Sequence, residues 1–96
     1  MDKSYIYIIG NLDKSELKVG YSSNPKSRLS TLQTGRIDKL NIYYEAEIDK
    51  KKVKYIESKI HHEIGHLRIN KEWFKCDLNK LINEIDHAII RYGDDI

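Results

Sequence analysis

The stretch His62-Glu63-Ile64-Gly65-His66 has the residue types and the spacing of a zinc site. Two histidines four positions apart lie on one face of a helix and can hold a metal ion, and a glutamate after the first can act as a general base in peptide hydrolysis. Metallopeptidases use this arrangement. Whether it applies to this chain depends on which side of the helix carries the two histidines.

The helix expected to carry this motif begins near Lys50 and has a single apolar stripe. Successive residues are about 100° apart around a helix, and five apolar residues fall in one sector: Val53, Ile56, Ile60, Ile64 and Leu67. His62 and His66 fall on the opposite side, which predicts exposure to solvent. A peptidase needs its ligands in a cleft, and Ile69 stands where the longer form of the motif has a glycine. We therefore interpret the motif as a solvated helix face.

A carboxylate lies at the edge of the same apolar stripe. Glu57 borders it, and His61 follows one helical turn later on the same flank. In this position a carboxylate can project into a site built over a sheet. An ordinary border glutamate would instead pair with Lys54 or Lys59 nearby, and the helix alone leaves both interpretations open.

The elements that position these residues follow from periodicity and turn residues. The apolar run 5–9 predicts a strand, and residues 17–21 predict its hairpin partner. Asn24 is expected to cap a helix that starts at Pro25 and stops before Gly35. Residues 40–47 predict the next strand. Asp77 is expected to cap a last helix with its own apolar stripe.

This order (β-β-α-β-α-α) predicts an α+β fold, in which a small three-stranded, mostly antiparallel sheet is flanked by three helices. A length of 96 residues indicates one domain, residues 1–96. Seventeen Lys and Arg residues against 15 Asp and Glu residues leave a net charge of +2. This charge permits a nucleic-acid partner through a local patch but does not by itself predict one.

Cysteine usage and hydropathy predict the compartment. Cys76 is the sole cysteine, so an intrachain disulfide is excluded and a reducing environment is expected. The apolar run near the N-terminus is too short for a secretory signal, and no segment approaches the length of a membrane span. We therefore expect an intracellular protein, cytoplasmic or nuclear, with no membrane partner.

Four residues on successive elements form an ordered set: Tyr7, Lys18, Arg28 and Glu57. With their neighbours they make the chain resemble the GIY-YIG nuclease superfamily. Tyr5-Ile6-Tyr7 stands where that family has G-I-Y, and Lys18-Val19-Gly20 stands where it has Y-I-G.

Further positions extend this resemblance from Tyr5 to about Phe74. Arg28 is similar in position to the family arginine, Glu57 to its metal-binding glutamate and Asn70 to its last polar residue. The chain is most similar to a branch found in phages, large viruses and fungi that is often described as DNA-binding. That branch has KVGYS-like second motifs and a late E-W-F, which is residues 72–74 here.

The resemblance implies a DNA endonuclease that depends on Mg²⁺ or Mn²⁺. Glu57 would hold the metal, which stabilises charge on the phosphoryl oxygens and the departing 3′ oxygen. Arg28 would offer a planar, permanently charged fork to the phosphate. Tyr7 would be the general base, and Lys18 on the paired strand would lower its pKa from the ordinary value of about 10.

Some positions depart from the family pattern. Tyr5 replaces the first glycine, and Lys18 replaces the tyrosine of the second motif. Leu32 stands four residues after Arg28, where many members have His or Tyr. Two other residues are candidates to replace this accessory group, namely Tyr21 and His61.

Two alternatives remain beside the nuclease. One is a catalytically weak or inactive DNA-binding module of the same fold, and the other is a protein-interaction domain whose tyrosine-rich sheet face only packs. The joint presence of the four site residues favours hydrolysis, whereas Leu32 and the small net charge favour binding. A separate recognition domain does not fit in 96 residues. Such a chain would therefore cut with little specificity, form a homodimer, or rely on a separate partner for target specificity.

Overall fold

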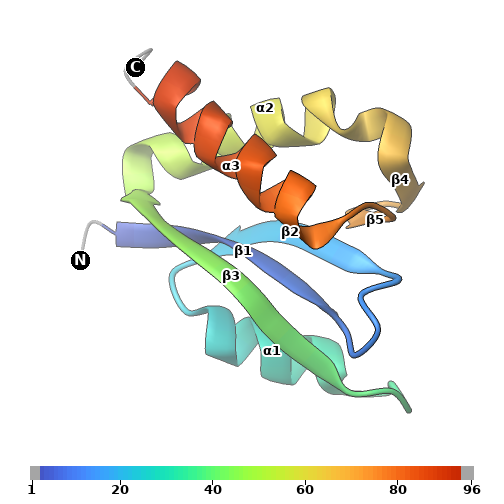
Figure 1. The fold of residues 1–96 in the computed structure, drawn as a ribbon. Coiled ribbons are helices and arrows are strands. Elements are labelled where there is room, and N and C mark those ends of the chain that lie inside the picture. Colours follow the sequence, from blue (N-terminus) through green and yellow to red (C-terminus); the bar gives the residue numbers. More distant parts are fainter. Residues whose placement is uncertain (1–2, 94–96) are drawn as a thin grey trace.

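The computed structural model describes residues 3–93, so both ends of the expected domain 1–96 lie outside the described residues. One antiparallel sheet of five strands packs with three α-helices and one short 3-10 helix (Figure 1). The strands are β1 (Lys3–Asn11), β2 (Leu17–Ser22), β3 (Leu40–Asp49), β4 (Arg68–Asn70) and β5 (Trp73–Phe74). The helices are α1 (Pro25–Gln33), α2 (Lys50–Glu63), η1 (Gly65–Leu67) and α3 (Leu78–Tyr92).

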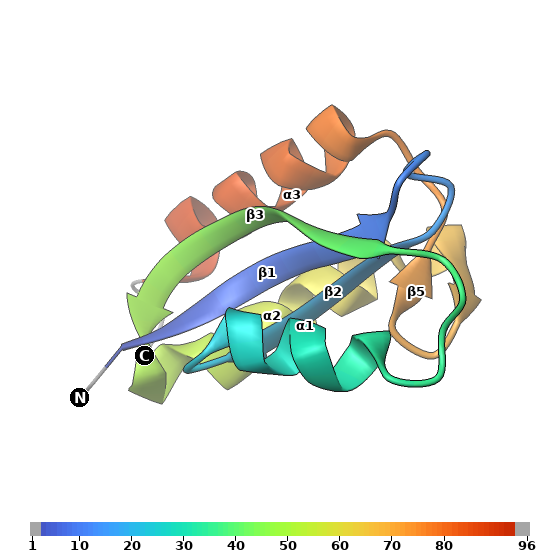
Figure 2. The ribbon, with the colours of Figure 1, turned by 90° about the horizontal axis from the view of Figure 1, so that it is seen from below.

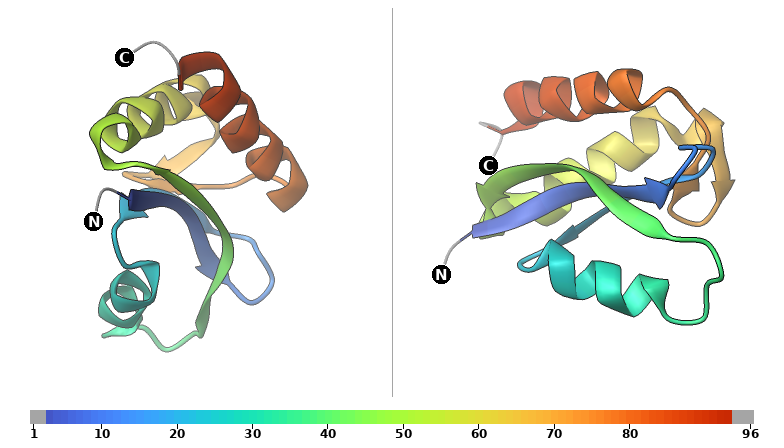
Figure 3. Two further views of the ribbon diagram at one scale, coloured as in Figure 1. Left: turned by 90° about the vertical axis from the view of Figure 1, so that its left-hand side faces the viewer. Right: turned by 60° about the horizontal axis from the view of Figure 1, so that its bottom comes forward.

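The sheet separates two unequal apolar layers. Its strand order is β3-β1-β2-β5-β4, with α1 on one face and both α2 and α3 on the other (Figures 2 and 3). Alternation along β1 sends Ile6 and Ile8 into the larger cluster under α2 and α3. The same alternation sends Tyr7 and Ile9 into the smaller cluster under α1. The side chain of Tyr7 therefore leaves β1 on the face of the sheet that α1 covers.

The residues predicted to cap or end the helices do so in the structure. The side chain of Asn24 accepts a hydrogen bond from the Ser27 amide, and Pro25 occupies the start of α1. Gly35, just after this helix, has a φ of 84°, which glycine adopts without strain. Asp77 caps α3 by accepting from the Lys80 amide. The predicted starts of these two helices are confirmed.

The prediction of a three-stranded sheet is wrong, because the connection before α3 forms a hairpin. Strands β4 and β5 pair with each other, and β5 continues the sheet by pairing with β2 at Leu17–Phe74 and Lys18–Trp73. Strands of three and two residues are too short for alternation to reveal. The α+β class itself is confirmed.

The second helix is also shorter than its apolar stripe predicted. It ends at Glu63, and Leu67 lies in the following 3-10 turn. A glycine at position 65 lowers helix propensity there. His66 is therefore not on α2. None of the helices within residues 3–93 combines the length and the apolar character needed to cross a membrane.

The hairpin covers only the first part of the β2 edge. Its last main-chain contact is the Val19 amide, which donates to the Glu72 carbonyl at 3.2 Å. Within the described residues, no strand pairs with the outer edge of β2 from Gly20 onward. This free edge lies between α1 on one face of the sheet and α2 on the other (Figure 3).

Candidate functional site

A pocket of about 260 Å³ lies at the free edge of β2. Residues from β1, β2, α1, α2 and the β4–β5 turn line it: Tyr7, Gly20, Tyr21, Arg28, Glu57 and Glu72. The structure thus brings together three of the four predicted catalytic residues, Tyr7, Arg28 and Glu57, although they are far apart along the chain. Lys18 does not line this pocket, but its ammonium contacts Glu72, which does.

Tyr7 reaches the free edge because its partner across the strand pair is a glycine. Tyr7 and Gly20 are directly opposite each other in the β1–β2 pair. A Cβ atom on Gly20 would lie 2.7 Å from Cζ of Tyr7, which is too close for any side chain. The ring therefore lies across β2, with Tyr7 only 1% exposed overall.

The phenol of Tyr7 is less acidic than usual. Burial raises its pKa above the ordinary value, the nearby Arg28 guanidinium lowers it in part, and the carboxylates of Glu72 and Glu57 raise it again. The expectation that Lys18 lowers the pKa of Tyr7 is wrong. The cation that faces Tyr7 is Arg28, because the Lys18 ammonium is turned to Glu72.

Arg28 is exposed on α1, one turn after the Asn24 cap. It borders a second pocket, of about 230 Å³, which adjoins the first through this shared residue. The other residues of the second pocket carry hydroxyl or amide groups: Ser22, Ser23, Asn24, Ser27 and Thr31. Arg28 therefore stands between a pocket with carboxylates and one with neutral polar groups.

Glu57 is held by His61 rather than by Lys54 or Lys59. Its side chain is 12% exposed, and its Oε2 atom lies 3.4 Å from Nε2 of His61. The same Nε2 lies 2.8 Å from the carbonyl oxygen of Val19. Burial raises the pKa of Glu57, His61 and Lys18 oppose this shift, and the Glu72 carboxylate adds to it. Positive charge close to Glu57 is therefore favourable.

Sequence reasoning did not identify Glu72 as a site residue. It lies in the turn between β4 and β5, and only the hairpin carries it to the pocket. Its Oε1 atom is 2.5 Å from the Lys18 ammonium, whose side chain is 11% exposed. Burial would raise the pKa of Glu72, but the hydrogen bond and charge of Lys18 lower it below the ordinary value. The E-W-F pattern was the one available signal.

The remaining predicted residues divide between the pocket and its surroundings. Tyr21 lines the pocket, whereas His61 contacts Glu57 from outside it. Asn70 is exposed on β4 and does not line the pocket, so its expected place in the site is wrong. Leu32 packs against the small cluster under α1, as its apolar character predicted. His62 is exposed, as the phase of α2 predicted, and His66 is also exposed although it lies in η1 beyond the end of that helix.

The two carboxylates suit a hard divalent cation. Mg²⁺ is commonly bound by one or two protein carboxylates together with water and substrate phosphate. Glu57 and Glu72 both line the pocket and fit this mode. Within residues 3–93, no three or more His, Cys, Asp and Glu side chains gather into a metal-holding group. A cation held by these two residues would keep positions for water and phosphate.

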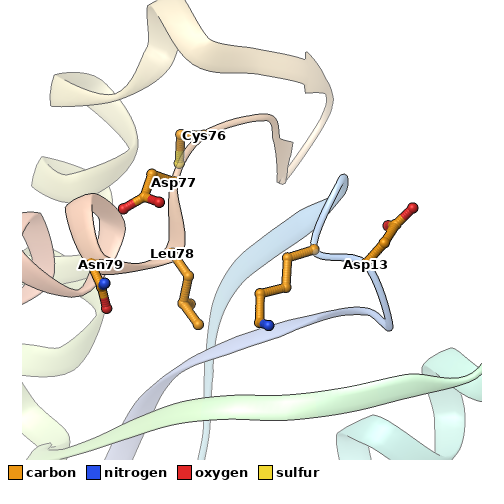
Figure 4. Close-up of a pocket in the computed structure, with 6 residues that line it drawn as sticks. Asp13, Cys76, Asp77, Leu78 and Asn79 are labelled. Carbon is orange, nitrogen blue, oxygen red and sulfur yellow. The ribbon is translucent and has the colours of Figure 1, made fainter.

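A larger pocket, of about 480 Å³, lies away from these residues. It separates the β1–β2 turn, with Asp13 and Lys14, from the start of α3 (Figure 4). Asp77 in this pocket already caps α3 through the Lys80 amide. The pocket contains no sequence-predicted site residue, so we assign the candidate site to the β2 edge.

Comparison with protein families identifies the domain. Residues 4–91 match the family model of the T5orf172 domain. No curated protein and no solved structure matches the chain. Because the match covers most of the sequence, the chain belongs to the T5orf172 domain family, which is found in endonuclease-like proteins.

Proposed function

We propose that this T5orf172 domain is a metal-dependent DNA endonuclease of the GIY-YIG type. The observation that carries the proposal is the convergence of Tyr7, Arg28 and Glu57 on one pocket from three different elements. Phosphodiester hydrolysis needs a proton acceptor, a fixed positive charge and a cation site held close together. A phenol, a guanidinium and a carboxylate at one sheet edge meet these needs.

Glu57, with Glu72 beside it, would hold Mg²⁺ or Mn²⁺. When bound, the cation would supply charge stabilisation at the phosphoryl oxygens and at the departing 3′ oxygen. Arg28 would donate a pair of parallel hydrogen bonds to the phosphate, in a geometry that lysine does not reproduce. His61 and Lys18 would orient the two carboxylates, because His61 contacts Glu57 and Lys18 contacts Glu72.

Tyr7 would take the proton of the attacking water. The water oxygen forms a bond to phosphorus, its proton passes to the Tyr7 phenolate, and the bond from phosphorus to the 3′ oxygen breaks with its electron pair on that oxygen. Only the phenolate accepts this proton. Since burial raises the pKa of Tyr7, the reactive form is a small fraction at neutral pH and increases as pH rises.

Exposed lysines on α2 supply sequence-independent attraction for DNA. Lys50 and Lys54 precede Glu57 by seven and three residues, so they lie on the same flank of the helix. Lysine contacts to phosphates provide affinity without reading bases. A local patch of this kind is compatible with the small net charge of the chain.

A DNA-binding module without hydrolysis is the second candidate. The observation that favours it is the raised pKa of Tyr7, because a protonated phenol is not a base. Arg28 and the α2 lysines would still bind phosphates in such a module. The two candidates differ only in whether bound DNA is cut.

Nicking of supercoiled plasmid in Mg²⁺ or Mn²⁺ separates the candidates. The wild type should nick, and Glu57→Gln should keep DNA affinity but lose nicking, because the substitution keeps the shape of the side chain and removes its charge. Glu45→Gln is the matched control, since Glu45 is exposed on β3 and outside the pocket. Binding without nicking in any divalent ion would leave only the binding module. Nicking by Glu57→Gln at the wild-type rate would remove Glu57 from the mechanism.

A further inference from the structure

Tyr21 presents an exposed aromatic ring at the pocket. It is 37% exposed, and it is the sole residue among the large exposed apolar side chains of the described residues that lines this pocket. Within residues 3–93, its hydroxyl makes no hydrogen bond with another side chain or with the backbone, no aromatic ring packs on its ring, and no cation lies over the face of the ring. By contrast, the hydroxyls of Tyr43, Tyr44 and Tyr92 donate to protein oxygens. Tyr21 thus keeps both of its binding groups available.

The strand geometry sets where this ring lies relative to the phosphate-binding groups. Tyr21 is opposite Ile6 in the β1–β2 pair, so its side chain lies on the α2 face, whereas Gly20 and Tyr7 face α1. The pocket therefore has Arg28 on one side of the β2 edge and Tyr21 with Glu57 on the other. A nucleotide whose phosphate lies between Arg28 and Glu57 would extend its sugar and base toward the rim that carries Tyr21.

We propose that Tyr21 stacks on an unpaired nucleobase next to the phosphate held in the pocket. This inference rests on the proposed function only in requiring that the pocket binds a DNA phosphate. A base inside a continuous duplex is stacked on both faces, so a single side chain reaches its face only when the base leaves the stack. Single-stranded DNA, or a duplex with a local unpaired nucleotide, is therefore the preferred substrate of this site.

A stacking role of the Tyr21 ring can be told apart from a catalytic role of its hydroxyl. A phenylalanine ring stacks as well as a tyrosine ring but has no proton to give. Tyr21→Phe should therefore retain the preference for unpaired DNA, and Tyr21→Ala should lose it. Ile90→Ala is the matched control for removal of an exposed apolar side chain, because Ile90 is 76% exposed on α3, outside the pocket.

The test measures binding of three oligonucleotides of one sequence in EDTA, so that cleavage does not interfere. These are a single strand, a blunt duplex and a duplex with one unpaired nucleotide. The wild type should prefer the single strand and the interrupted duplex. Tyr21→Ala should weaken binding to these two by about 5- to 150-fold, the range for one base–aromatic stack. It should leave the blunt duplex nearly unchanged.

Equal losses on all three oligonucleotides, no loss on any, or an equal loss in Tyr21→Phe would overturn the stacking role. The plasmid assay judges hydrolysis separately. A Tyr21-dependent preference without nicking would keep this inference and reject the endonuclease. Nicking with no effect of Tyr21→Ala on binding would keep the endonuclease and reject this inference. Absence of binding to every oligonucleotide would overturn the stacking role, and the plasmid assay in Mg²⁺ or Mn²⁺ would still judge the endonuclease.

Discussion

The Nε2 atom of His61 lies 2.8 Å from the carbonyl oxygen of Val19, so a side chain of α2 continues the edge of β2 where strand pairing ends. The amide of the same Val19 donates to Glu72 in the β4–β5 turn. The imidazole packs edge-on against Phe74, with ring centroids 5.2 Å apart. This one side chain therefore joins the second helix, the sheet edge and the hairpin beside Glu57.

Loss of the His61 ring should affect both stability and cation binding. In His61→Ala the buried Val19 carbonyl loses its partner, and we expect the free energy of unfolding to fall by about 1–3 kcal/mol. Mg²⁺ affinity should fall as well, because Glu57 loses the neighbour that orients it. His61→Gln, which retains an N–H donor, should recover part of both losses. Denaturant unfolding and Mg²⁺ titration measure them, and an effect no larger than that of exposed His62→Ala would refute the role.

Gly20→Ala should disrupt the site through Tyr7. The new methyl group would overlap the Tyr7 ring, and we expect a loss of about 1–3 kcal/mol in stability, as for other overpacked interiors. The displaced hydroxyl should also abolish nicking. Gly65→Ala is the control, because nothing lies within 4 Å of a Cβ at that position. If Gly20→Ala nicks and unfolds like Gly65→Ala, the position of the Tyr7 ring described above is wrong.

The pH dependence of nicking should change when Arg28 is replaced and not when Lys18 is replaced. A phenolate base becomes more populated as pH rises, so the wild-type rate should rise with pH through the neutral range. Arg28 lowers the pKa of Tyr7. Arg28→Gln should therefore move the pH–rate curve to higher pH, in addition to lowering all rates. Lys18→Met also removes one cation, but its curve should keep its position. A shift in Lys18→Met alone would reverse this assignment.

The Lys18–Glu72 pair should make stability depend on pH in the acidic range. The pKa of Glu72 is lowered in the folded protein, so its contribution is present above the unfolded value and is lost as pH falls through the folded value. The wild type should therefore gain stability between pH of about 3 and 6. Over the same pH range the Lys18→Met variant should gain less stability than the wild type. The difference should be at most about 1 kcal/mol, because Glu72 is half exposed and solvent screens the pair. Urea unfolding at both pH values measures the difference, and identical gains would exclude the pair as its source.

Local sequence determined most of the elements that carry the site. The apolar runs, the Asn24 and Asp77 caps and the Pro25 start each act within a few residues, so they were readable without tertiary structure. The phase of the second helix likewise separated exposed His62 from Glu57, whose side chain is mostly buried. The family resemblance added the order of Tyr7, Lys18, Arg28 and Glu57 along the chain.

Tertiary structure alone decided which charges face each other. The hairpin that pairs with β2 consists of strands too short to leave a periodic pattern. It brings Glu72 to Lys18, although the two residues are 54 positions apart in the sequence. The family resemblance placed both Lys18 and Arg28 in the site of Tyr7, but the fold turns Lys18 to Glu72 and Arg28 to the phenol. Such pairings depend on the packing of whole elements, whereas caps and stripes depend on the neighbouring residues of one element.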